Sequence, residues 1–171
     1  KSNKIDLTLV GPEAPLEDGI VDLFVSEKQL IFGPSKKAAQ IETSKVWAKN
    51  LMTKYDIPTA NFFSFNDFTS AEKFILSQKN LSWVIKADGL AAGKGVILTN
   101  NKEESINALK QILIDRKFGN AGNKIIIEEM LFGKEVSIFS FVNGKFVSSH
   151  IAACDYKRSH DGDKGLNTGG M

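Results

Sequence analysis

The chain has 171 residues, 42% of them hydrophobic, which is enough to bury the core of one or two domains. Its 22 basic and 20 acidic residues leave a net charge of +2, which is too balanced to indicate a nucleic-acid or membrane surface. One cysteine, Cys154, excludes an internal disulfide and is compatible with the reducing cytoplasm, and no apolar run has the length of a membrane span.

A strand–helix–strand unit is predicted at the start of the chain. The apolar run 5–10 is typical of a buried strand and 30–32 of a second, shorter one. Pro15 suits the first turn of a connecting helix, whose apolar stripe is Leu16, Ile20, Leu23 and Phe24. In a βαβ unit, ligands bind at the carboxyl ends of the parallel strands, where Gly11, Pro12 and Glu13 lie. Glu13 is also explained as an acidic first-turn residue favoured by the helix dipole.

Helix formers dominate from Ser35 to Tyr55, and Pro58 follows as a helix breaker. On this run we expect three packed residues, Trp47, Leu51 and Met52. Lys45 by itself is the kind of helical lysine that is usually solvated. The apolar stretch 62–65 comes next, and we place the start of a second subdomain there.

Two helices and a strand are predicted around the middle of the chain. Thr69 and Glu72 have capping-box spacing at the start of one helix, which carries Phe68, Ala71, Phe74 and Ile75. Asn100 and Glu103 have the same spacing at the start of another, which carries Ile106, Leu109, Ile112 and Leu113. A loop over 119–123 and a strand over 124–128 complete an α+β subdomain with helices on one face of an antiparallel sheet.

The most informative stretch lies between these helices, at 83–98. Two short apolar runs, 83–85 and 96–98, predict a hairpin whose tip is rich in glycine and carries Lys94. The tip is longer than a simple reversal needs, and glycine amides with a mobile lysine suit a phosphate. A glycine-rich surface turn is the alternative. The spacing fits neither a Walker A loop nor the dinucleotide fingerprint, and no helix pattern follows.

The remaining sequence holds carboxylates, a hairpin and a polar end. Glu128 and Glu129 end the predicted strand and, taken alone, are expected to face solvent. Asn143-Gly144 is a strong turn signal between the runs 136–142 and 145–151. The stretch 154–171 is so polar that composition alone allows a disordered tail, and His160 has no partner at metal-ligand spacing.

Four segments together resemble one family. The hairpin, with Lys86 on its first strand and the wording VIKADGLAAGKGV, resembles the ATP-grasp superfamily and, more closely, the phosphoribosylamine–glycine ligase (glycinamide ribonucleotide synthetase) family. VGPEAPL near the start, the Ser44-Lys45 segment and the DxKR…NTGGM ending resemble it too, in the same order. Tyr156 and Leu166 depart from the family's usual histidine and proline; Leu166 removes a φ constraint from its loop.

The resemblance implies a role for each matching residue. ATP-binding residues would be Lys45, Lys86, Gly89, Gly93, Lys94, Gly95, Glu128, Glu129, Leu131 and Glu135. Among these, Glu129 and Leu131 would present backbone groups to adenine and Glu135 would accept the ribose hydroxyls. Substrate-binding residues would be Gly11, Pro12, Glu13, Asp155, Lys157, Asn167, Thr168, Gly169 and Gly170. The residues acting in catalysis would be Lys94, Lys157 and Arg158.

The implied activity is ATP-dependent ligation of glycine to 5-phosphoribosylamine through glycyl phosphate, a step of purine biosynthesis in the cytoplasm, by a protein that is monomeric at full length. ATP and Mg²⁺ (or Mn²⁺) would be the cofactors. No metal site is expected within this chain, because the family's metal ligands are expected beyond Met171 and its first strand before Lys1; the fragment alone is expected to be inactive. Two alternatives stay open: another ATP-grasp ligase or carboxylase, and a non-catalytic nucleotide-binding module.

The implied fold is α/β and α+β, a partial ATP-grasp fold preceded by the end of a parallel-sheet βαβ domain. Four segments are expected: 1–34 as the end of the βαβ domain, 35–61 as a helical connection, 62–132 as the small nucleotide-covering subdomain, and 133–171 as the start of the larger subdomain.

Overall fold

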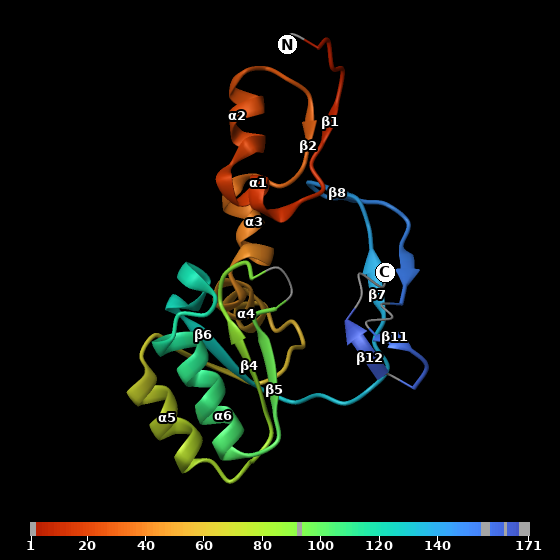
Figure 1. Cartoon of the computed structure of the whole chain (residues 1–171). Coiled ribbons are helices and arrows are strands. Elements are labelled where there is room, and N and C mark those ends of the chain that lie inside the picture. The colour runs from red at the N-terminus through yellow and green to blue at the C-terminus, as the bar shows by residue number, and fades with distance from the viewer. Residues whose placement is uncertain (1–2, 92–93, 155–157, 163, 168–171) are drawn as a thin grey trace. The chain divides into compact units, whose positions relative to one another are not determined.

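The computed structural model describes residues 3–91, 94–154, 158–162 and 164–167 (Figure 1). The chain divides into two compact units, Lys1–Met130 and Leu131–Met171. No helix in the described part is both long and apolar enough to cross a bilayer.

The first unit begins with the predicted parallel strand pair. Strand β1 (Thr8–Leu9) pairs with β2 (Ile31–Phe32) in parallel, so the βαβ prediction is confirmed, although both strands are shorter than expected. The connection is not one helix but two, α1 (Glu13–Asp18) and α2 (Ile20–Ser26). The break falls at Gly19, whose φ of 91° is left-handed and therefore ends α1 in the way glycine commonly ends helices.

Two further helices lead to the sheet. Helix α3 (Lys36–Thr43) and helix α4 (Lys45–Lys54) are each capped by a serine side chain, that of Ser35 and that of Ser44. Ser44 takes an extended conformation (φ −132°, ψ 108°), and this residue divides the helical run expected from Ser35 to Tyr55 into two helices. Helix α4 ends before Pro58, as its sequence predicts.

A four-stranded sheet forms the centre of the first unit. Its strands are β3 (Phe62–Phe65), β4 (Trp83–Ala87), β5 (Val96–Thr99) and β6 (Ile125–Glu129). Their order is β3-β6-β4-β5, and every neighbouring pair is antiparallel. Helices α5 (Phe68–Ser77) and α6 (Lys102–Leu109) lie on one face, as predicted, and a π-helical turn (Lys110–Ile114) extends α6 (Figure 1).

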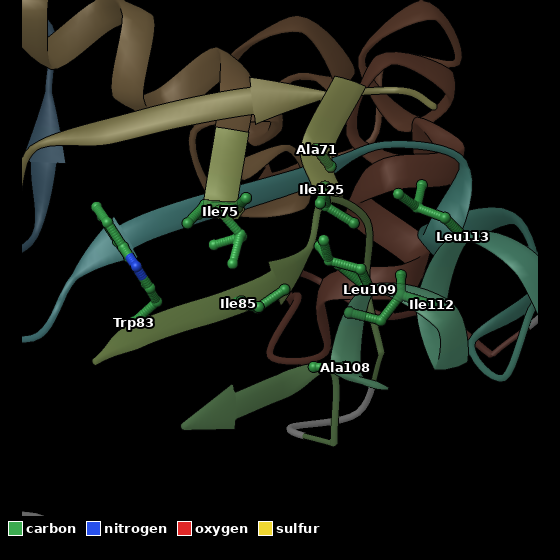
Figure 2. Close-up of a cluster of buried hydrophobic side chains, with 11 residues drawn as sticks. Ala71, Ile75, Trp83, Ile85, Ala108, Leu109, Ile112, Leu113 and Ile125 are labelled. Atoms are coloured by element: carbon green, nitrogen blue, oxygen red, sulfur yellow. The ribbon is translucent and has the colours of Figure 1, made fainter. Parts of the chain in front are cut away.

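The core fills the space between this sheet and the two helices (Figure 2). Along β4 the side chains alternate: Trp83, Ile85 and Ala87 are buried, whereas Val84 and Lys86 are only partly covered. Strand β6 differs, because its residues from Ile125 to Glu128 are all buried. The core members with no exposed surface come from both layers and are Ala71, Ile75, Ile85, Ala87, Leu109, Ile112, Ile125 and Ile127.

Three local predictions in this unit were wrong. Helix α5 is capped by Asp67 and not by Thr69, because the Asp67 carboxylate accepts a hydrogen bond from the Ser70 amide (2.8 Å). The cap of α6 is displaced by one residue, because Asn101 rather than Asn100 accepts from the Glu104 amide (2.8 Å). The stretch Gly119–Asn123 is a 3₁₀ helix and not a loop.

The second unit consists of short antiparallel pairs. Strand β7 (Ser137–Phe139) pairs with β10 (Ile151–Ala153), and β8 (Val142–Asn143) pairs with β9 (Phe146–Val147) across the predicted turn, with Gly144 at φ 58°. Beyond them β11 (Arg158–His160) pairs with β12 (Lys164–Asn167), so regular backbone continues into the polar end.

Candidate functional site

The glycine-rich loop at 88–95, called the lid loop here, joins β4 to β5 at the end of the sheet. The backbone bond from Ala87 N to Gly95 O (2.8 Å) closes the strand pair beneath it. Gly95 is buried, and the Lys94 side chain is exposed. The loop amides were expected to bind an anion, but the Gly89 amide donates its hydrogen bond to Ala121 O (3.3 Å) instead. Gly93 lies outside the described residues.

The start of the lid loop is fixed to the first turn of α4. The Asp88 carboxylate accepts from the Val46 amide (2.7 Å) and from the Ser44 hydroxyl (3.2 and 3.3 Å). In return, the Lys45 ammonium donates to the carbonyls of Asp88 (3.4 Å) and Gly89 (3.1 Å). Asp88 thus neutralises the positive end of the helix and determines where the lid loop leaves the sheet.

Lys45 is partly buried in this arrangement. Burial lowers the pKa of its ammonium from the usual value, and the neighbouring Lys86 lowers it further, while Asp88, Glu42 and Glu128 oppose the shift. The charges of Lys45 and Lys86 are therefore close enough to affect each other, which is expected if both lysines bind phosphate. The prediction that Lys45 contacts phosphate is compatible with this position, but its sequence-based default of full solvation was wrong.

Lys86, Glu128 and Lys49 form a charged cluster on the face of the sheet opposite α5 and α6. The Lys86 ammonium lies 2.8 Å from Glu128 Oε2, and the Lys49 ammonium lies 3.4 Å from Glu128 Oε1. Glu128 is 5% exposed, so the expectation that it faces solvent was wrong; the two lysines compensate its burial. Lys49 was missed by sequence reasoning, although its spacing of four from Lys45 places both on one side of α4.

Glu129 has different surroundings from Glu128, since neighbouring strand residues point to opposite faces. Its carboxylate accepts from the Asn61 amide (2.9 Å) and from Asn61 Nδ2 (3.1 Å). These two hydrogen bonds lower the pKa of the Glu129 carboxyl. The Glu129 amide in turn donates to Asn61 O (3.1 Å), which fixes the end of β6 where backbone recognition of adenine is expected.

A separate cavity of about 440 Å³ lies beside the cluster in the first unit. Its lining residues are Glu17, Lys36, Gln40, Thr43, Ser44, Asp88, Gly89, Asn120, Ala121, Asn123 and Lys124. Among the predicted nucleotide residues that the structure describes, Gly89 alone contributes to it, whereas Lys45, Lys86 and Glu128 do not. The convergent charges, rather than this cavity, mark the candidate phosphate site. Among the residues that the structure describes, no group of three or more His, Cys, Asp or Glu side chains is placed to hold a metal ion.

The predicted substrate residues near the start of the chain lie where the βαβ pattern places them. Gly11, Pro12 and Glu13 follow β1 at its carboxyl end and are exposed. Pro12 precedes α1 without a side-chain cap, and Glu13 is the first residue of that helix. Their contact with a substrate stays a prediction, as does the reading of Glu13 as a residue that favours the helix start.

The other predicted site residues belong to the second unit. Leu131 is exposed, and the carbonyl of Glu135 accepts a hydrogen bond from the Cys154 thiol (3.6 Å). Arg158 and Asn167 lie directly opposite each other in the β11–β12 pair. The positions that lie outside the described residues are Asp155, Lys157, Thr168, Gly169 and Gly170.

Comparison with known proteins identifies the family of these two units. Residues 43–171 match the model of the phosphoribosylglycinamide synthetase ATP-grasp (A) domain, and residues 1–42 match that of the N domain of the same enzyme family. The ATP-grasp fold expected from the sequence is thereby confirmed, as is the α/β segment before it.

Individual relatives agree. The chain is 51% identical over its full length to a phosphoribosylamine–glycine ligase of Halalkalibacterium halodurans and 52% identical over 99% of its length to one of Caldanaerobacter subterraneus. It spans 40% of the length of each of these curated relatives. The crystal structure of a phosphoribosylamine–glycine ligase from Thermotoga maritima superposes with a TM-score of 0.73 at 40% identity, covering 86% of this chain and 38% of that one. The chain therefore belongs to the phosphoribosylglycinamide synthetase family, and its residues match the N domain and the ATP-grasp domain of that family.

Proposed function

We propose that the full-length protein containing this chain joins glycine to 5-phosphoribosylamine with ATP, giving glycinamide ribonucleotide, ADP and phosphate. A glycine carboxylate oxygen attacks the γ-phosphorus of ATP and ADP leaves, which forms glycyl phosphate. The amine of phosphoribosylamine then attacks the acyl carbon, an amide bond forms and phosphate leaves. The observation that carries this proposal is the group of lysines, Lys45, Lys86 and Lys49, gathered around Glu128 beside the lid loop in a chain of this family.

Phosphoryl transfer needs positioning and charge neutralisation more than covalent help from the protein. Lys45 and Lys86 supply two ammonium groups from different elements, and Lys94 supplies a third from the exposed part of the lid loop. Closure of the lid loop over bound phosphates would also keep water from the acyl phosphate. In this proposal Gly89 fixes the start of the loop through Ala121.

The remaining assignments follow the family pattern and are proposed as a set. Backbone groups of Glu129 and Leu131 read adenine, and Glu135 accepts the ribose hydroxyls. Glycine and phosphoribosylamine are bound by Gly11, Pro12, Glu13, Asp155, Lys157, Asn167, Thr168, Gly169 and Gly170. Lys94, Lys157 and Arg158 act in catalysis. Mg²⁺ (or Mn²⁺) is held by residues of the full-length protein outside this chain and would supply positive charge to the phosphates. The full-length protein acts as a monomer in the cytoplasm.

The subdomain arrangement is likewise proposed. Residues 1–34 end the βαβ domain, 35–61 connect it to the next domain, 62–132 cover the nucleotide, and 133–171 begin the larger subdomain. The division into compact units after Met130 and the family boundary after residue 42 support a scheme of this kind. Helix α4 contributes Lys45 and Lys49 to the sheet, so the connection takes part in the site.

The test is a ligase assay on the full-length protein with ATP, glycine and phosphoribosylamine. We expect glycinamide ribonucleotide, and we expect Lys86→Ala to weaken ATP binding severely because a phosphate partner is lost and Glu128 is left with one cation. Lys73→Ala, which removes an exposed lysine of α5, is the matched control and should behave as wild type. An unchanged apparent affinity for ATP in Lys86→Ala would refute the role of Lys86. Formation of a different amide or of a carboxylated product would refute the proposed reaction.

A further inference from the structure

Lys49 differs from the other lysines of the site because its ammonium is buried and contacts protein groups. It donates to Thr59 Oγ1 (2.7 Å) and to Ala60 O (3.0 Å), and it lies 3.4 Å from Glu128 Oε1. Two of the three ammonium donors thus make hydrogen bonds within the protein, and the charge is paired with the Glu128 carboxylate. The residue is 6% exposed, and its ammonium also lies 5.6 Å from the centre of the Phe62 ring. Lys49 is therefore buried and held by the protein through two hydrogen bonds and an ion pair.

Lys86 is placed differently in the same cluster. Among the described residues, its ammonium donates a hydrogen bond to Glu128 Oε2 alone, at 2.8 Å. Two of its three donors are therefore left for a ligand. Its side chain is 26% exposed, whereas that of Glu128 is 6% exposed. The contacts thus run from the buried ammonium of Lys49 through the buried carboxylate of Glu128 to the partly exposed ammonium of Lys86.

The charges of this cluster show what Lys49 adds. A pair of Lys86 and Glu128 would be neutral, and Glu128 would cancel most of the attraction of Lys86 for a phosphate. With Lys49 on its other oxygen, Glu128 is shared between two cations and the cluster keeps one net positive charge. Stability is a weak explanation for the arrangement, because a buried ion pair is often no more stable than an apolar replacement.

We propose that Lys49 is a positioning residue for the nucleotide phosphates. It fixes the Glu128 carboxylate and balances its charge, so that Lys86 keeps both its direction and its attraction for a polyanion. This inference rests on the proposed function and adds to it a residue whose ammonium does not touch the nucleotide.

The test is calorimetric titration of the full-length protein and its Lys49→Met variant with ADP, so that binding is measured without the ligase reaction. The removed charge is a short distance from the phosphates in a partly buried site, and we expect roughly tenfold weaker binding. Because the effect is electrostatic, the difference from wild type should shrink as salt is added. In ligase assays the KM for ATP should rise while kcat and the KM for glycine stay unchanged.

Two further variants make the result decisive. Lys54→Met changes an exposed lysine at the end of the same helix, near the Tyr55 ring, and should bind ADP as wild type does. Thr59→Val removes one hydrogen-bond acceptor of the Lys49 ammonium and keeps its charge, so we expect ADP affinity to fall roughly two- to threefold. If Lys49→Met does not fold, the ADP affinity of Thr59→Val tests the inference, and an affinity equal to that of wild type overturns it. A folded Lys49→Met variant with unchanged ADP affinity, or one with lower stability and kcat alone, overturns the inference. A wild-type protein that binds ADP but makes no glycinamide ribonucleotide overturns the proposed function instead.

Discussion

The clamp between Asp88 and helix α4 gives the sharpest prediction about the lid loop. In Asp88→Ala, the Val46 amide loses a charged acceptor at 2.7 Å and the Ser44 hydroxyl loses one at 3.2 Å. The Ser44 side chain still caps the helix through the Trp47 amide (3.1 Å), so α4 keeps one of its two caps. The change therefore loosens the first turn of α4 and the start of the lid loop, without removing either element.

The expected magnitude follows from these contacts. A hydrogen bond to a charged group contributes roughly 1.5–3 kcal/mol, and a carboxylate at a helix start about 0.3–1 kcal/mol more. Asp88 is partly exposed, so we take a loss of about 2 kcal/mol, toward the lower end of these ranges. Since about 1.4 kcal/mol corresponds to a factor of ten, local opening of this turn becomes roughly 30-fold more frequent.

Hydrogen–deuterium exchange of the full-length protein, followed by mass spectrometry, measures this opening in the peptide that contains Val46. Asp67→Ala is the matched control, because Asp67 caps α5 through the Ser70 amide and should change exchange in that helix alone. We also expect a higher KM for ATP in Asp88→Ala, because Lys45 loses the nearby carboxylate that favours its charged form. Exchange at Val46 that matches wild type would show that the clamp does not hold the lid loop.

Three other predictions concern stability and pH. Ile85→Ala, at a fully buried position of β4, should destabilise the first unit by about 2–5 kcal/mol, measured as faster exchange of β4 and β6 amides. Thr99→Val removes a buried hydroxyl bonded to Trp83 O (3.0 Å) and to the Ser105 hydroxyl (2.8 Å), and should cost about 1–3 kcal/mol in denaturant titrations. Because the pKa of Lys45 is lowered, its ammonium should lose its charge at a lower pH than the 10.5 of an ordinary lysine. ADP affinity should therefore be highest below the pKa of Lys45 and fall as the pH rises through it. Between that pKa and 10.5 the free energy of unfolding should rise with pH, since the unfolded state binds more protons.

The sheet of the first unit was predictable because its strands are short apolar runs between clear breaks. Phe62–Phe65, Trp83–Ala87 and Val96–Thr99 appear close to where the residue pattern places them. Helix starts were less predictable. Asn100 and Asn101 are adjacent and both suit a cap, and only the fold decides that Asn101 bonds to Glu104.

The charged cluster shows a different limit of sequence reasoning. The burial of Glu128 depends on Lys49, which is far away in the chain, and no local pattern at Glu128-Glu129 indicates which carboxylate is buried. Strand alternation separates the two once the pairing is known, because Glu128 lies opposite Val84 and Glu129 lies opposite Trp83. The family resemblance predicted roles for Lys45 and Lys86, whereas the capping contact of Asp88 with helix α4 became visible only in the structure.

The pairing of β4 with β6 also determines where this protein tolerates changes in length. Lys86 lies opposite Ile126, and Ile85 lies opposite Ile127, so this register decides which residues of β6 share a face of the sheet with Lys86. One inserted residue in β6 before Glu128 would turn its carboxylate to the other face of the sheet, away from Lys49 and Lys86. Related sequences should therefore vary in the segment between Asp115 and Lys124, and keep the residue count of β6 constant.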